Sequence, residues 1–528
     1  MALGRLRKDR GFQAPEDLLG DRLGGIYRLL ATHGDELFGE DYFADLFTSS
    51  SRGRPTVPGR VLATVMTLQS FEGLSDREAV DRVSRDLAWQ AAAGLAAGAE
   101  SFDHTVLVRM RALLCKSDRP KRFLEDTVVM ARAAGVLSDR ARVVDSTPIF
   151  DAVATQDTVT QLRAVIRTLL RMLDRRGDGQ ASEVRAVLVR DDDYKAPGKP
   201  SCDWGDPDAR EALVDELVRD VLAAVAVFEG RVVDPELADH LAFMVYIAGQ
   251  DTETDDNGRF RIARKVAKDR VISTVDREAR HGHKSKARLF DGYKAHLRSD
   301  PDGEIIDEVV VTAANTPDAG PLPGLLDDLV ETQANTGEAP VIYGDAGYGA
   351  ASTLEWLDEA GLGFVIKVPT PTRRAGRWSK ADFGVDTEVG TVTCPTGVTV
   401  AIRFRSDGSG VARFAEACER CPLREHCTTA ETGRTISIHR REDILQTERF
   451  TQASDPDWND SYTGDRPKVE RKLAHLIRKP WGGRRARMRG ATRIEGDLVS
   501  RAAAINLDRM SRLGVIWNAA SGWQVQPP

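Results

Sequence analysis

Two acidic residues stand where the sequence predicts the carboxyl ends of buried strands. Asp345 follows the β-branched and aromatic run 341–344 and precedes small residues that cannot continue a strand. Open α/β sheets place their chemistry at such strand ends. Asp145 follows the shorter run 142–144 and precedes Pro148, which we expect to end regular strand pairing. Both carboxylates are therefore candidates for one site at the edge of a sheet.

Glu470 supplies a third acid, on a helix that we expect to begin at Asp465 with Pro467 in its first turn. Carboxylates that converge repel one another unless a cation neutralises them, and Mg²⁺ binds a few carboxylate oxygens while keeping water or phosphate as its other ligands. A paired-metal site of this kind activates an attacking oxygen and stabilises a leaving oxygen in phosphoryl transfer. The candidate catalytic residues and ligands of Mg²⁺ (or Mn²⁺) are Asp145, Asp345 and Glu470.

Basic residues surround Glu470 and continue after it, as expected if the substrate is an anionic phosphate backbone. A second basic segment, 280–288, precedes an alternating strand pattern. The candidate DNA contacts from these two regions are Arg466, Lys468, Arg471, Lys472, Arg484, Arg485, Lys284 and Lys286.

At these residues the chain resembles the DDE transposases of bacterial insertion sequences, whose catalytic domain has an RNase H-like fold. The family pattern is an acid on the first strand, an Asp followed by small residues and an aromatic after the fourth strand, and a helix with a Y-R-E-K signature. Three residues separate Tyr462 from Arg466, where the commonest form has two, and Arg478 or Lys479 would have to serve as the final Lys. The matching positions are Asp145, then 345–348, then Tyr462, Arg466 and Glu470.

The resemblance implies Mg²⁺-dependent hydrolysis at the ends of a DNA element, followed by attack of the freed 3′-hydroxyl on target DNA. It implies that Tyr462 and Arg466 orient DNA at the cleavage point, and that two copies of the chain act together on two DNA ends. Two other functions share the same acids: a metal-dependent DNA nuclease without strand transfer, and a DNA-binding derivative that has lost catalysis. A strand-transfer assay would separate them.

Two further acids compete with the chosen three. Asp276 ends the run 271–275, which also reads as a strand, so it is a rival to Asp145. We prefer Asp145 because of the resemblance and because the sequence Ser-Thr-Pro follows it directly. Glu495 is an alternative third acid on a final helix expected from Ile494, but it lacks Tyr and Arg partners on that helix.

The expected order of elements is a strand, a long helical insertion, a hairpin, a helix, a strand and an acid. The hairpin should pair 290–296 with 304–311 across the turn 300–303. RNase H-like folds have this order once the insertion is removed, so we expect an α/β protein with an RNase H-like mixed sheet. The expected domains are a helical N-terminal DNA-binding domain, 1–135, and a catalytic domain, 136–520, interrupted by a helical insertion, 155–265, and a strand-rich cysteine-containing insertion, 370–460.

In the N-terminal region, two helices joined by the short turn 72–75 have helix-turn-helix spacing. Pattern alone favours an ordinary helical packing domain, whereas the resemblance favours binding of DNA ends. The arginines that could contact phosphates there are Arg52, Arg54, Arg60, Arg77, Arg82 and Arg85.

Four of the six cysteines lie in the second insertion. Cys418 and Cys421 form a Cys-x-x-Cys step, Cys427 follows six residues later, and Cys394 could complete a tetrahedral zinc site. The alternative is a set of reduced thiols without metal, because a second Cys-x-x-Cys pair is missing. Zinc bound there would be structural.

Length and composition indicate a globular protein of several domains, with 528 residues of which 41% are hydrophobic and 29% charged. No apolar run approaches the roughly 20 residues needed to cross a bilayer, and the start lacks the apolar core of a secretory signal, so we expect a cytoplasmic protein. The formal net charge of -7 argues against attraction of the whole molecule to nucleic acid. DNA binding would therefore depend on local basic patches.

Overall fold

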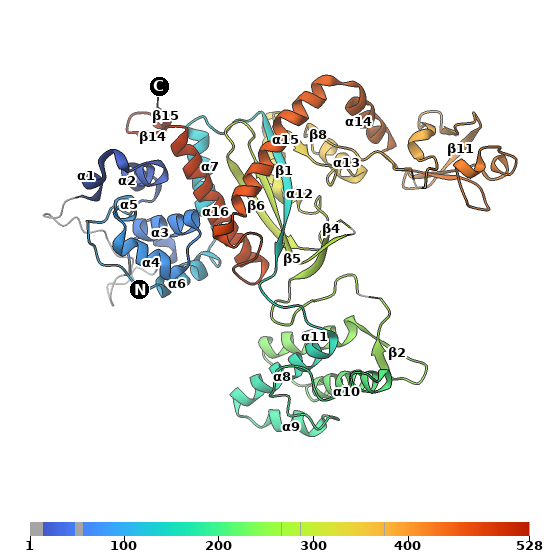
Figure 1. Cartoon of the computed structure of the whole chain (residues 1–528), viewed down its shortest axis with the longest axis horizontal. Helices are drawn as coiled ribbons and strands as arrows, with labels where there is room; N and C mark the ends of the chain where they lie inside the picture. The colour runs from blue at the N-terminus through green and yellow to red at the C-terminus, as the bar shows by residue number, and fades with distance from the viewer. Residues whose placement is uncertain (1–13, 48–55, 266, 286, 374, 527–528) are drawn as a thin grey trace.

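A six-stranded mixed sheet forms the centre of the molecule in the computed structural model, which describes residues 14–47, 56–265, 267–285, 287–373 and 375–526 (Figure 1). The strand order is β4-β5-β1-β7-β8, and β6 pairs with β5 beside β4. β1 is antiparallel to β5 and parallel to β7, and β7 is parallel to β8. The strands are β1 (Ala141–Phe150), β4 (Arg280–Ser285), β5 (Arg288–Ser299), β6 (Ile306–Ala313), β7 (Val341–Gly344) and β8 (Phe364–Ile366).

The predicted hairpin is confirmed, because β5 and β6 pair antiparallel with Tyr293 opposite Ala313 and Leu297 opposite Val309. β4 was not predicted as a strand, although it pairs antiparallel with β5. Its sequence, Arg-His-Gly-His-Lys-Ser, carries none of the alternating apolar residues that mark a half-buried strand. Charged residues of this kind are typical of edge strands, where they discourage pairing with other chains.

Pro148 does not end the pairing of β1, which corrects the expectation for this strand. Pro148 lies opposite Lys294, and the pairing with β5 runs on to Phe150. The pairing of β1 with β7 covers only residues 141–143. On that side of β1 the described chain pairs again only at Phe150, with Arg485, so Pro148 itself faces no partner there that would need the missing N–H.

The predicted strand at 271–276 is absent, and the segment is irregular although Val271 and Ile272 are buried. Glutamine side chains satisfy its backbone: Gln161 donates to the Val271 carbonyl at 2.8 Å, and Gln250 accepts from the Val271 N–H at 2.9 Å. A backbone satisfied by side chains and loops needs no neighbouring strand. Asp276 therefore does not end a strand.

Helices cover both faces of the central sheet. On one face, α12 (Leu322–Thr336) and α13 (Ala351–Glu359) pack against Val144 and Ile342. On the other face, α15 (Pro456–Leu476) and α16 (Ala491–Arg512) pack against Val143 and Tyr343. Adjacent residues of one strand serve opposite faces, because side chains alternate along a strand.

The helix that carries Glu470 begins earlier than predicted, since α15 starts at Pro456 and holds Pro467 in its interior. Asp455 caps it by accepting from the Asp457 N–H at 2.9 Å. An aspartate cap with proline at the first helical position is a strong start signal, and it lies ahead of the one chosen from Asp465.

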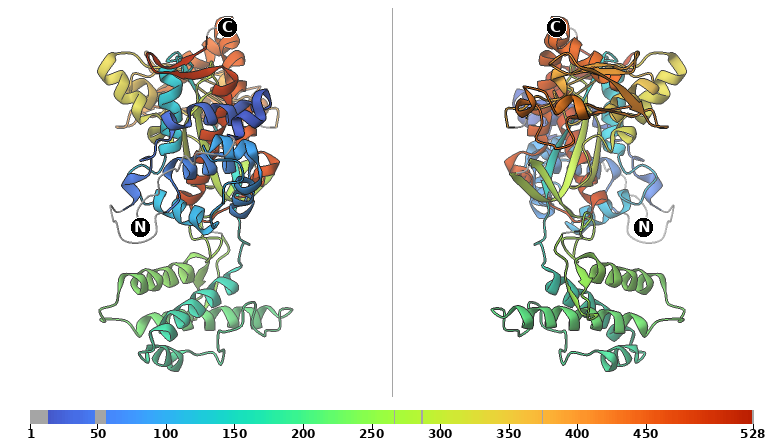
Figure 2. Two further views of the ribbon diagram at one scale, coloured as in Figure 1. Left: turned by 90° about the vertical axis from the view of Figure 1, so that its left-hand side faces the viewer. Right: turned by 90° about the vertical axis from the view of Figure 1, so that its right-hand side faces the viewer.

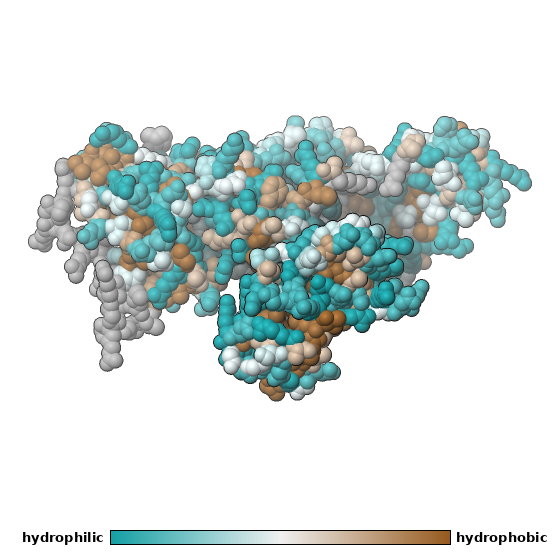
Figure 3. Space-filling view, turned by 60° about the horizontal axis from the view of Figure 1, so that its bottom comes forward, coloured by the Kyte–Doolittle hydropathy of each residue, from teal (hydrophilic) through white to brown (hydrophobic). Residues whose placement is uncertain are grey.

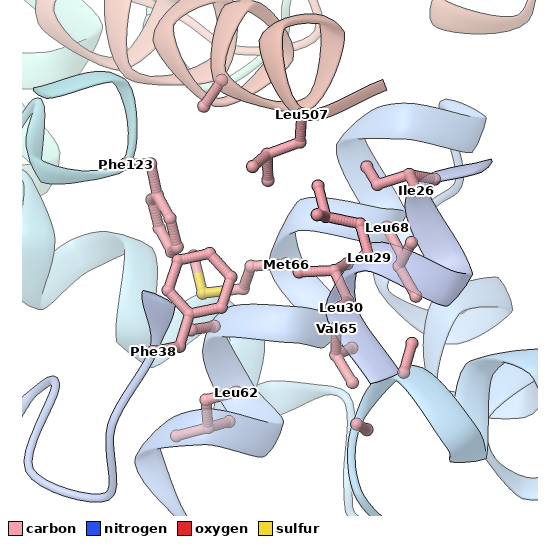
Figure 4. Packing of buried hydrophobic residues seen from close by; sticks show 14 of the residues in the cluster. Ile26, Leu29, Leu30, Phe38, Leu62, Val65, Met66, Leu68, Phe123 and Leu507 are labelled. Carbon is pink, nitrogen blue, oxygen red and sulfur yellow. The ribbon is translucent and has the colours of Figure 1, made fainter. Parts of the chain in front are cut away.

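α16 belongs to two hydrophobic cores. Its residues Ile494, Leu498 and Val499 pack in the core beneath the sheet. Farther along the same helix, Leu507 packs among the N-terminal helices (Figure 4), and Met510 belongs to the same core. A single helix therefore joins the N-terminal region to the sheet, and the short hairpin β14 (Val515–Asn518) and β15 (Gly522–Val525) follows it.

The N-terminal region is helical, and its predicted helix pair is present. α3 and α4 are joined by the turn that contains Gly73, and Ser75 and Glu78 form a capping box at the start of α4. The second helix ends sooner than predicted, because Asp86 separates α4 from α5. The helices of this region are α1 (Pro15–Leu19), α2 (Gly25–Leu37), α3 (Gly59–Glu72), α4 (Asp76–Arg85), α5 (Leu87–Ala92), α6 (Thr105–Leu114) and α7 (Arg122–Ala133).

The N-terminal arginines are mostly engaged within the protein. Arg60 is buried and paired with Asp35, so the expectation that it contacts phosphate is wrong in this arrangement. Arg82 pairs with Glu72 and Asp86, and Arg85 pairs with Asp81. Arg52 and Arg54 lie outside the described residues.

The first insertion lies below the sheet in Figures 1 and 2, and two chain segments connect it to the sheet. It consists of helices and one short hairpin around its own core. Figure 3 shows this face as largely hydrophilic, with scattered apolar patches on the insertion. The elements are α8 (Thr158–Arg176), α9 (Gln180–Val187), α10 (Pro207–Ala226), α11 (Pro235–Gln250), β2 (Thr252–Thr254) and β3 (Phe260–Ile262).

The second insertion lies at the opposite end of the molecule from the N-terminal helices (Figure 1). It is a five-stranded antiparallel sheet in the order β13-β12-β11-β10-β9, and α14 (Glu442–Ser454) leads back to α15. Its strands are β9 (Gly384–Asp386), β10 (Thr391–Thr393), β11 (Thr399–Phe404), β12 (Gly410–Arg413) and β13 (Thr435–Ile438). No helix in the described part of the chain is long and apolar enough to cross a membrane.

The turn between α3 and α4 fits tightly against the loop after α15. Gly73 has a φ of 73°, and a Cβ added there would lie 2.0 Å from Trp481 Cδ1 and 2.8 Å from the Pro480 carbonyl oxygen. Gly135 has a similar φ of 69° with open space around it. The two glycines therefore share a backbone conformation and differ in their surroundings.

We expect Gly73→Ala to lower the free energy of unfolding more than Gly135→Ala. Both alanines must adopt a left-handed conformation, which costs about 1–2 kcal/mol. Gly73→Ala also overpacks the contact with Trp481, which typically adds about 1–3 kcal/mol. Thermal or denaturant unfolding measures the difference, and equal losses in the two variants would contradict the close contact.

Candidate functional site

A pocket of about 550 Å³ opens where β1, β5 and the end of β7 face α15. It is lined by polar residues of both charges and a few apolar ones. The residues around it include Asp145, Ser146, Thr147, Pro148, His283, Lys284, Phe290, Lys294, Asp318, Asp345, Gly347, Arg466, Glu470, Leu473, Ala474, Ile477 and Arg484. All three predicted acids are among them.

The three acids converge on the side chain of Arg466. Its guanidinium lies 3.0 Å from an Asp145 oxygen, 3.8 Å from an Asp345 oxygen and 3.5 Å from a Glu470 oxygen. Carboxylates that are more than a hundred residues apart in sequence therefore share one counter-ion. The rivals do not join them, since neither Asp276 nor Glu495 lines the pocket.

Strand register places the two aspartates side by side. β1 and β7 are parallel neighbours with Val143 opposite Tyr343, so Asp145 and Asp345 each lie two residues farther along. Asp345 comes directly after β7, where the Gly347 N–H donates to its Oδ1 at 2.8 Å. Asp145 lies within β1 and accepts from the Ser146 N–H at 2.8 Å.

α15 brings the third acid and the arginine to the same place. Tyr462, Arg466 and Glu470 are spaced by four residues, so they lie close to one face of a continuous helix. Ser461 on this helix shares a hydrogen bond of 2.5 Å with the Tyr343 hydroxyl of β7, and Tyr462 stacks on Trp458 with ring centroids 5.0 Å apart. The Ser461–Tyr343 hydrogen bond fixes the rotation of the helix about its axis, whereas Tyr462 and Trp458 both lie on α15 itself.

Burial makes the charge of Asp145 costly. Desolvation raises the pKa of Asp145 to about 6, and the neighbouring Asp345 adds to the rise, while Arg466 and the Ser146 N–H oppose it. Arg466 is also buried, and its Nε and Nη1 atoms make no hydrogen bond within the described residues. The site therefore combines crowded acids with a guanidinium whose donors are only partly used.

The candidate DNA contacts divide into two groups. Lys284 and Arg484 line the pocket, and Arg485 is exposed beside it, where its backbone bridges to Phe150. Lys286 lies outside the described residues. Of the four candidates on α15, Arg466 lines the pocket and the other three do not.

Lys468, Arg471 and Lys472 do not line the pocket, and each pairs with another acid, so their contact with DNA stays a prediction. Lys468 pairs with Asp465 at 2.9 Å, and both Arg471 and Lys472 pair with Glu304, at 2.8 and 3.1 Å. Lys472 has only 3% of its side chain exposed, and burial lowers its pKa despite the Glu304 charge. Helix periodicity explains this, because residues one or two positions from Glu470 point to other faces.

Two charged residues of the pocket were missed. Lys294 on β5 donates to Asp318 Oδ1 at 2.8 Å, and the Ser146 hydroxyl donates to the same oxygen at 2.9 Å. Asp318 lies in the turn between β6 and α12, within an Asn-Thr-Pro-Asp run that reads as an ordinary turn. Lys294 sits in the middle of an alternating strand, so no local pattern marked either residue.

The rejected acids have structural partners. Asp276 is buried and accepts from the Tyr293 hydroxyl at 2.6 Å and from the Gly490 N–H at 3.1 Å. Glu495 accepts from the Val311 N–H at 2.8 Å and pairs with Lys121 at 3.4 Å. Each of these carboxylates holds two elements of the fold together.

The chemistry of the donors suits a hard divalent cation, which prefers carboxylate oxygens. As the side chains stand, no group of three or more His, Cys, Asp or Glu residues in the described ranges is arranged to hold a metal ion. Arg466 lies among the three carboxylates in this arrangement. The acids would have to move apart from that guanidinium, by side-chain rotation, to bind a cation.

The four cysteines of the second insertion line one small cavity together with Phe383 and Phe414. Cys418 and Cys427 are buried in the core of the five-stranded sheet, and all four thiols are free. Cys394 Sγ lies 3.0 Å from the Thr396 hydroxyl, and Cys418 Sγ accepts from the Arg434 N–H. The four predicted zinc ligands are therefore neighbours, whereas Cys115 and Cys202 lie in other regions.

Two protein families match separate parts of the chain. The family described as "Transposase DDE domain" matches residues 393–511, which include α15 and its Arg466 and Glu470. The family described as "Transposase domain (DUF772)" matches residues 20–113 in the N-terminal helices. No curated protein and no solved structure matches the chain significantly. These matches confirm the resemblance to DDE transposases of insertion sequences and indicate transposase function.

We expect Arg466→Gln to destabilise the protein and Asp145→Asn to restore part of the loss in the double variant. Removing one partner of a buried ion pair costs about 3–5 kcal/mol, because the other charge stays buried. Asparagine removes that charge at nearly the same volume. Denaturant unfolding of both single variants and the double variant measures the coupling, and strictly additive effects would show that the two side chains do not interact.

Proposed function

We propose that this protein is a DDE transposase that cuts DNA at the ends of an insertion sequence and joins the freed ends to target DNA. The observation that carries the proposal is the meeting of Asp145, Asp345 and Glu470 around Arg466 in one pocket. Carboxylates from two strands and a helix share one guanidinium. Stability alone does not require this arrangement, because each acid could have been neutralised by its own partner.

The topology of the sheet supports an RNase H-like catalytic core. β6, β5 and β1 run antiparallel in that spatial order, and β7 and β8 follow in parallel on the other side of β1. Along the chain, the strand β1, the first insertion, the hairpin of β5 and β6, the helix α12 and the strand β7 follow one another in the order that we expected from the sequence. The first insertion enters after β1, and the second enters after β8.

Asp145, Asp345 and Glu470 would hold Mg²⁺ or Mn²⁺. When bound, such cations activate an attacking oxygen and stabilise the leaving oxygen of phosphoryl transfer. The protein's own contribution is to hold the three carboxylates on rigid elements, two on adjacent strands and one on a long helix. Arg466 offers unused donors at the same point, and a guanidinium of this kind suits a phosphate oxygen.

DNA would enter the pocket past Lys284, Arg484 and Arg485. Lys284 and Arg484 stand at its lining from different parts of the chain, so they could grip the backbone on either side of the reacting phosphate. Tyr462, one turn before Arg466, has its pKa raised by burial and feels the charges of the three acids. Its ring would stack on an unpaired base next to the cleavage point.

The N-terminal helices would bind the element ends, and two copies of the chain would act together on two ends. The match of residues 20–113 to a transposase domain supports the first statement. The second follows from the reaction, because both ends must be joined to one target. DNA contacts in this domain would come from side chains other than the buried Arg60.

We further propose a structural zinc site in the second insertion, held by Cys394, Cys418, Cys421 and Cys427. Four thiols around one cavity in a small sheet support it, because zinc sites of this kind stabilise domains with few core residues. Zinc there would stabilise the fold of the insertion and take no part in the reaction.

Asp345→Asn and Glu470→Gln should each abolish cleavage of labelled element ends in Mg²⁺, lowering the rate by at least about 100-fold because a metal ligand is lost. Glu495→Gln should keep most of the activity, since Glu495 lies outside the pocket. Gel-shift assays should find DNA binding retained in all three. If Asp345→Asn cleaved the ends as fast as the parent protein, the proposed role of the acids in the reaction would be wrong.

Ends that are already cut and carry a free 3′-hydroxyl separate a transposase from a nuclease. The parent protein should join such ends to a supercoiled plasmid, giving linear and nicked products that contain the label. A metal-dependent nuclease would cut but not join. An inactive DNA-binding derivative would bind the ends, do neither, and be unaffected by Asp345→Asn.

Zinc should be present at about one equivalent per chain, and Cys421→Ser should remove most of it, because a tetrahedral site needs all four ligands. Cys202→Ser is the matched control and should keep the metal, since Cys202 lies in the helical insertion. Elemental analysis of protein purified without chelators measures both. Parent protein free of zinc would contradict the proposal.

A further inference from the structure

A fourth carboxylate, that of Asp318, faces the same pocket as the three predicted acids. Its Oδ1 atom is held from two sides, by the Lys294 ammonium at 2.8 Å and the Ser146 hydroxyl at 2.9 Å. Lys294 is itself fixed by donating to the Thr316 carbonyl at 2.8 Å. The Oδ2 atom accepts no hydrogen bond from the part of the chain that the structure describes. One oxygen is therefore an anchor, and the other remains available.

Ser146 links Asp318 to the site through two different atoms. Its backbone N–H donates to Asp145 Oδ1 at 2.8 Å, while its hydroxyl donates to Asp318 Oδ1. A single residue of β1 therefore sets the positions of two carboxylates. Burial alone would raise the pKa of Asp318, but Lys294 outweighs it and lowers that pKa, so the side chain is charged at neutral pH.

Gly347 marks a gap between Asp318 and Asp345. A Cβ added to Gly347 would lie 2.9 Å from Asp345 Oδ1 and 3.1 Å from Asp318 Oδ2. Two carboxylate oxygens thus point at one position that only a glycine leaves open. Mg²⁺ binds oxygen at about 2.0–2.1 Å, so two oxygens that share a cation stand no more than about 4 Å apart. Both oxygens lie near that one position, and side-chain rotation would have to bring the two within that range.

A second observation points to a group bound among these acids. Tyr348 is 1% exposed, and its hydroxyl has no hydrogen-bond partner within the described residues. Burial raises the pKa of this hydroxyl well above its ordinary value, and the charges of Asp145, Asp318 and Asp345 add to the rise while Arg466 opposes it. A buried hydroxyl without a partner is costly unless something bound beside it satisfies it. The orphan atoms of Arg466 lie at the same site.

We propose that Asp318 is a fourth acid of the cation site, with its Oδ2 oxygen sharing a divalent cation with Asp345 across the gap at Gly347. The proposal rests on the proposed function, because it adds a ligand to the same metal site. Lys294 and Ser146 would act as positioning residues that hold Asp318 with its free oxygen toward the pocket.

Titration of the full chain with Mn²⁺, followed by electron paramagnetic resonance of free Mn²⁺, tests this without an activity assay. Asp318→Asn should weaken binding about tenfold, within the range that loss of a supporting group produces at metal sites. Asp328→Asn is the matched control, because Asp328 is also an ion-paired aspartate, bound to Arg298 outside the pocket. It should bind Mn²⁺ as the parent does.

Binding by Asp318→Asn within twofold of the parent would overturn the assignment. If that variant does not fold, Gly347→Ala decides in the same titration, since its methyl group would fill the gap, and unchanged binding would overturn the proposal. Asp345→Asn distinguishes a failure of the Asp318 assignment from a failure of the proposed metal site. Weaker binding in Asp345→Asn together with normal binding in Asp318→Asn rejects only Asp318, whereas normal binding in both variants also rejects the metal site of the proposed function.

Discussion

Mutual repulsion of carboxylates is the constraint on which this structure depends. Asp145 is almost buried, Asp345 and Glu470 lie close by, and Asp318 faces the same space. Such a group would push itself apart unless it were held by elements that are rigid for other reasons. The register of two parallel strands, the turn before α12 and the continuous helix α15 supply that rigidity. Arg466 offsets the charge from within the group, and Lys294 does so from its edge.

The surrounding architecture keeps those elements in place from a distance. α15 is fixed to β7 through Ser461 and Tyr343, and Val469 and Leu473 bury its inner face in the core beneath the sheet. α16 extends that core into the N-terminal helices, where Leu507 and Met510 pack. The two insertions have hydrophobic cores of their own and leave the sheet at the ends of β1 and β8, so they add to the molecule without interrupting the site.

Local patterns in the sequence were sufficient where strong signals follow one another directly. The run before Asp345, the hairpin of β5 and β6, and the helix between that hairpin and β7 were all predicted from alternation, turn residues and helical spacing, and all are present. The prediction that the acids converge came from the resemblance and from the chemistry of carboxylates. The choice of Asp145 over Asp276 agrees with the pocket, because Asp276 is occupied by Tyr293 and Gly490.

Other features depend on contacts that no local pattern reveals. Asp318 and Lys294 become neighbours only when β5 and the turn after β6 are packed together. Lys472 looks like an exposed cation in sequence, yet tertiary packing buries it against Glu304. The irregular segment 271–276 has the composition of a strand, but glutamines from α8 and α11 take its backbone bonds. Side chains that are distant in sequence overrode local propensity at each of these places.

The loop that contains Trp481 connects the N-terminal helices to the pocket with the acids. Arg484 of the same loop reaches the pocket, and Arg487 donates to the Leu74 carbonyl at 2.8 Å, so this loop touches the N-terminal helices and the acids at once. Together with α16, it makes the two regions one solid piece. If the N-terminal helices bind a specific DNA sequence, the fold fixes the distance between that binding site and the acids. The number of base pairs between the bound sequence and the bond that is cut would then be constant.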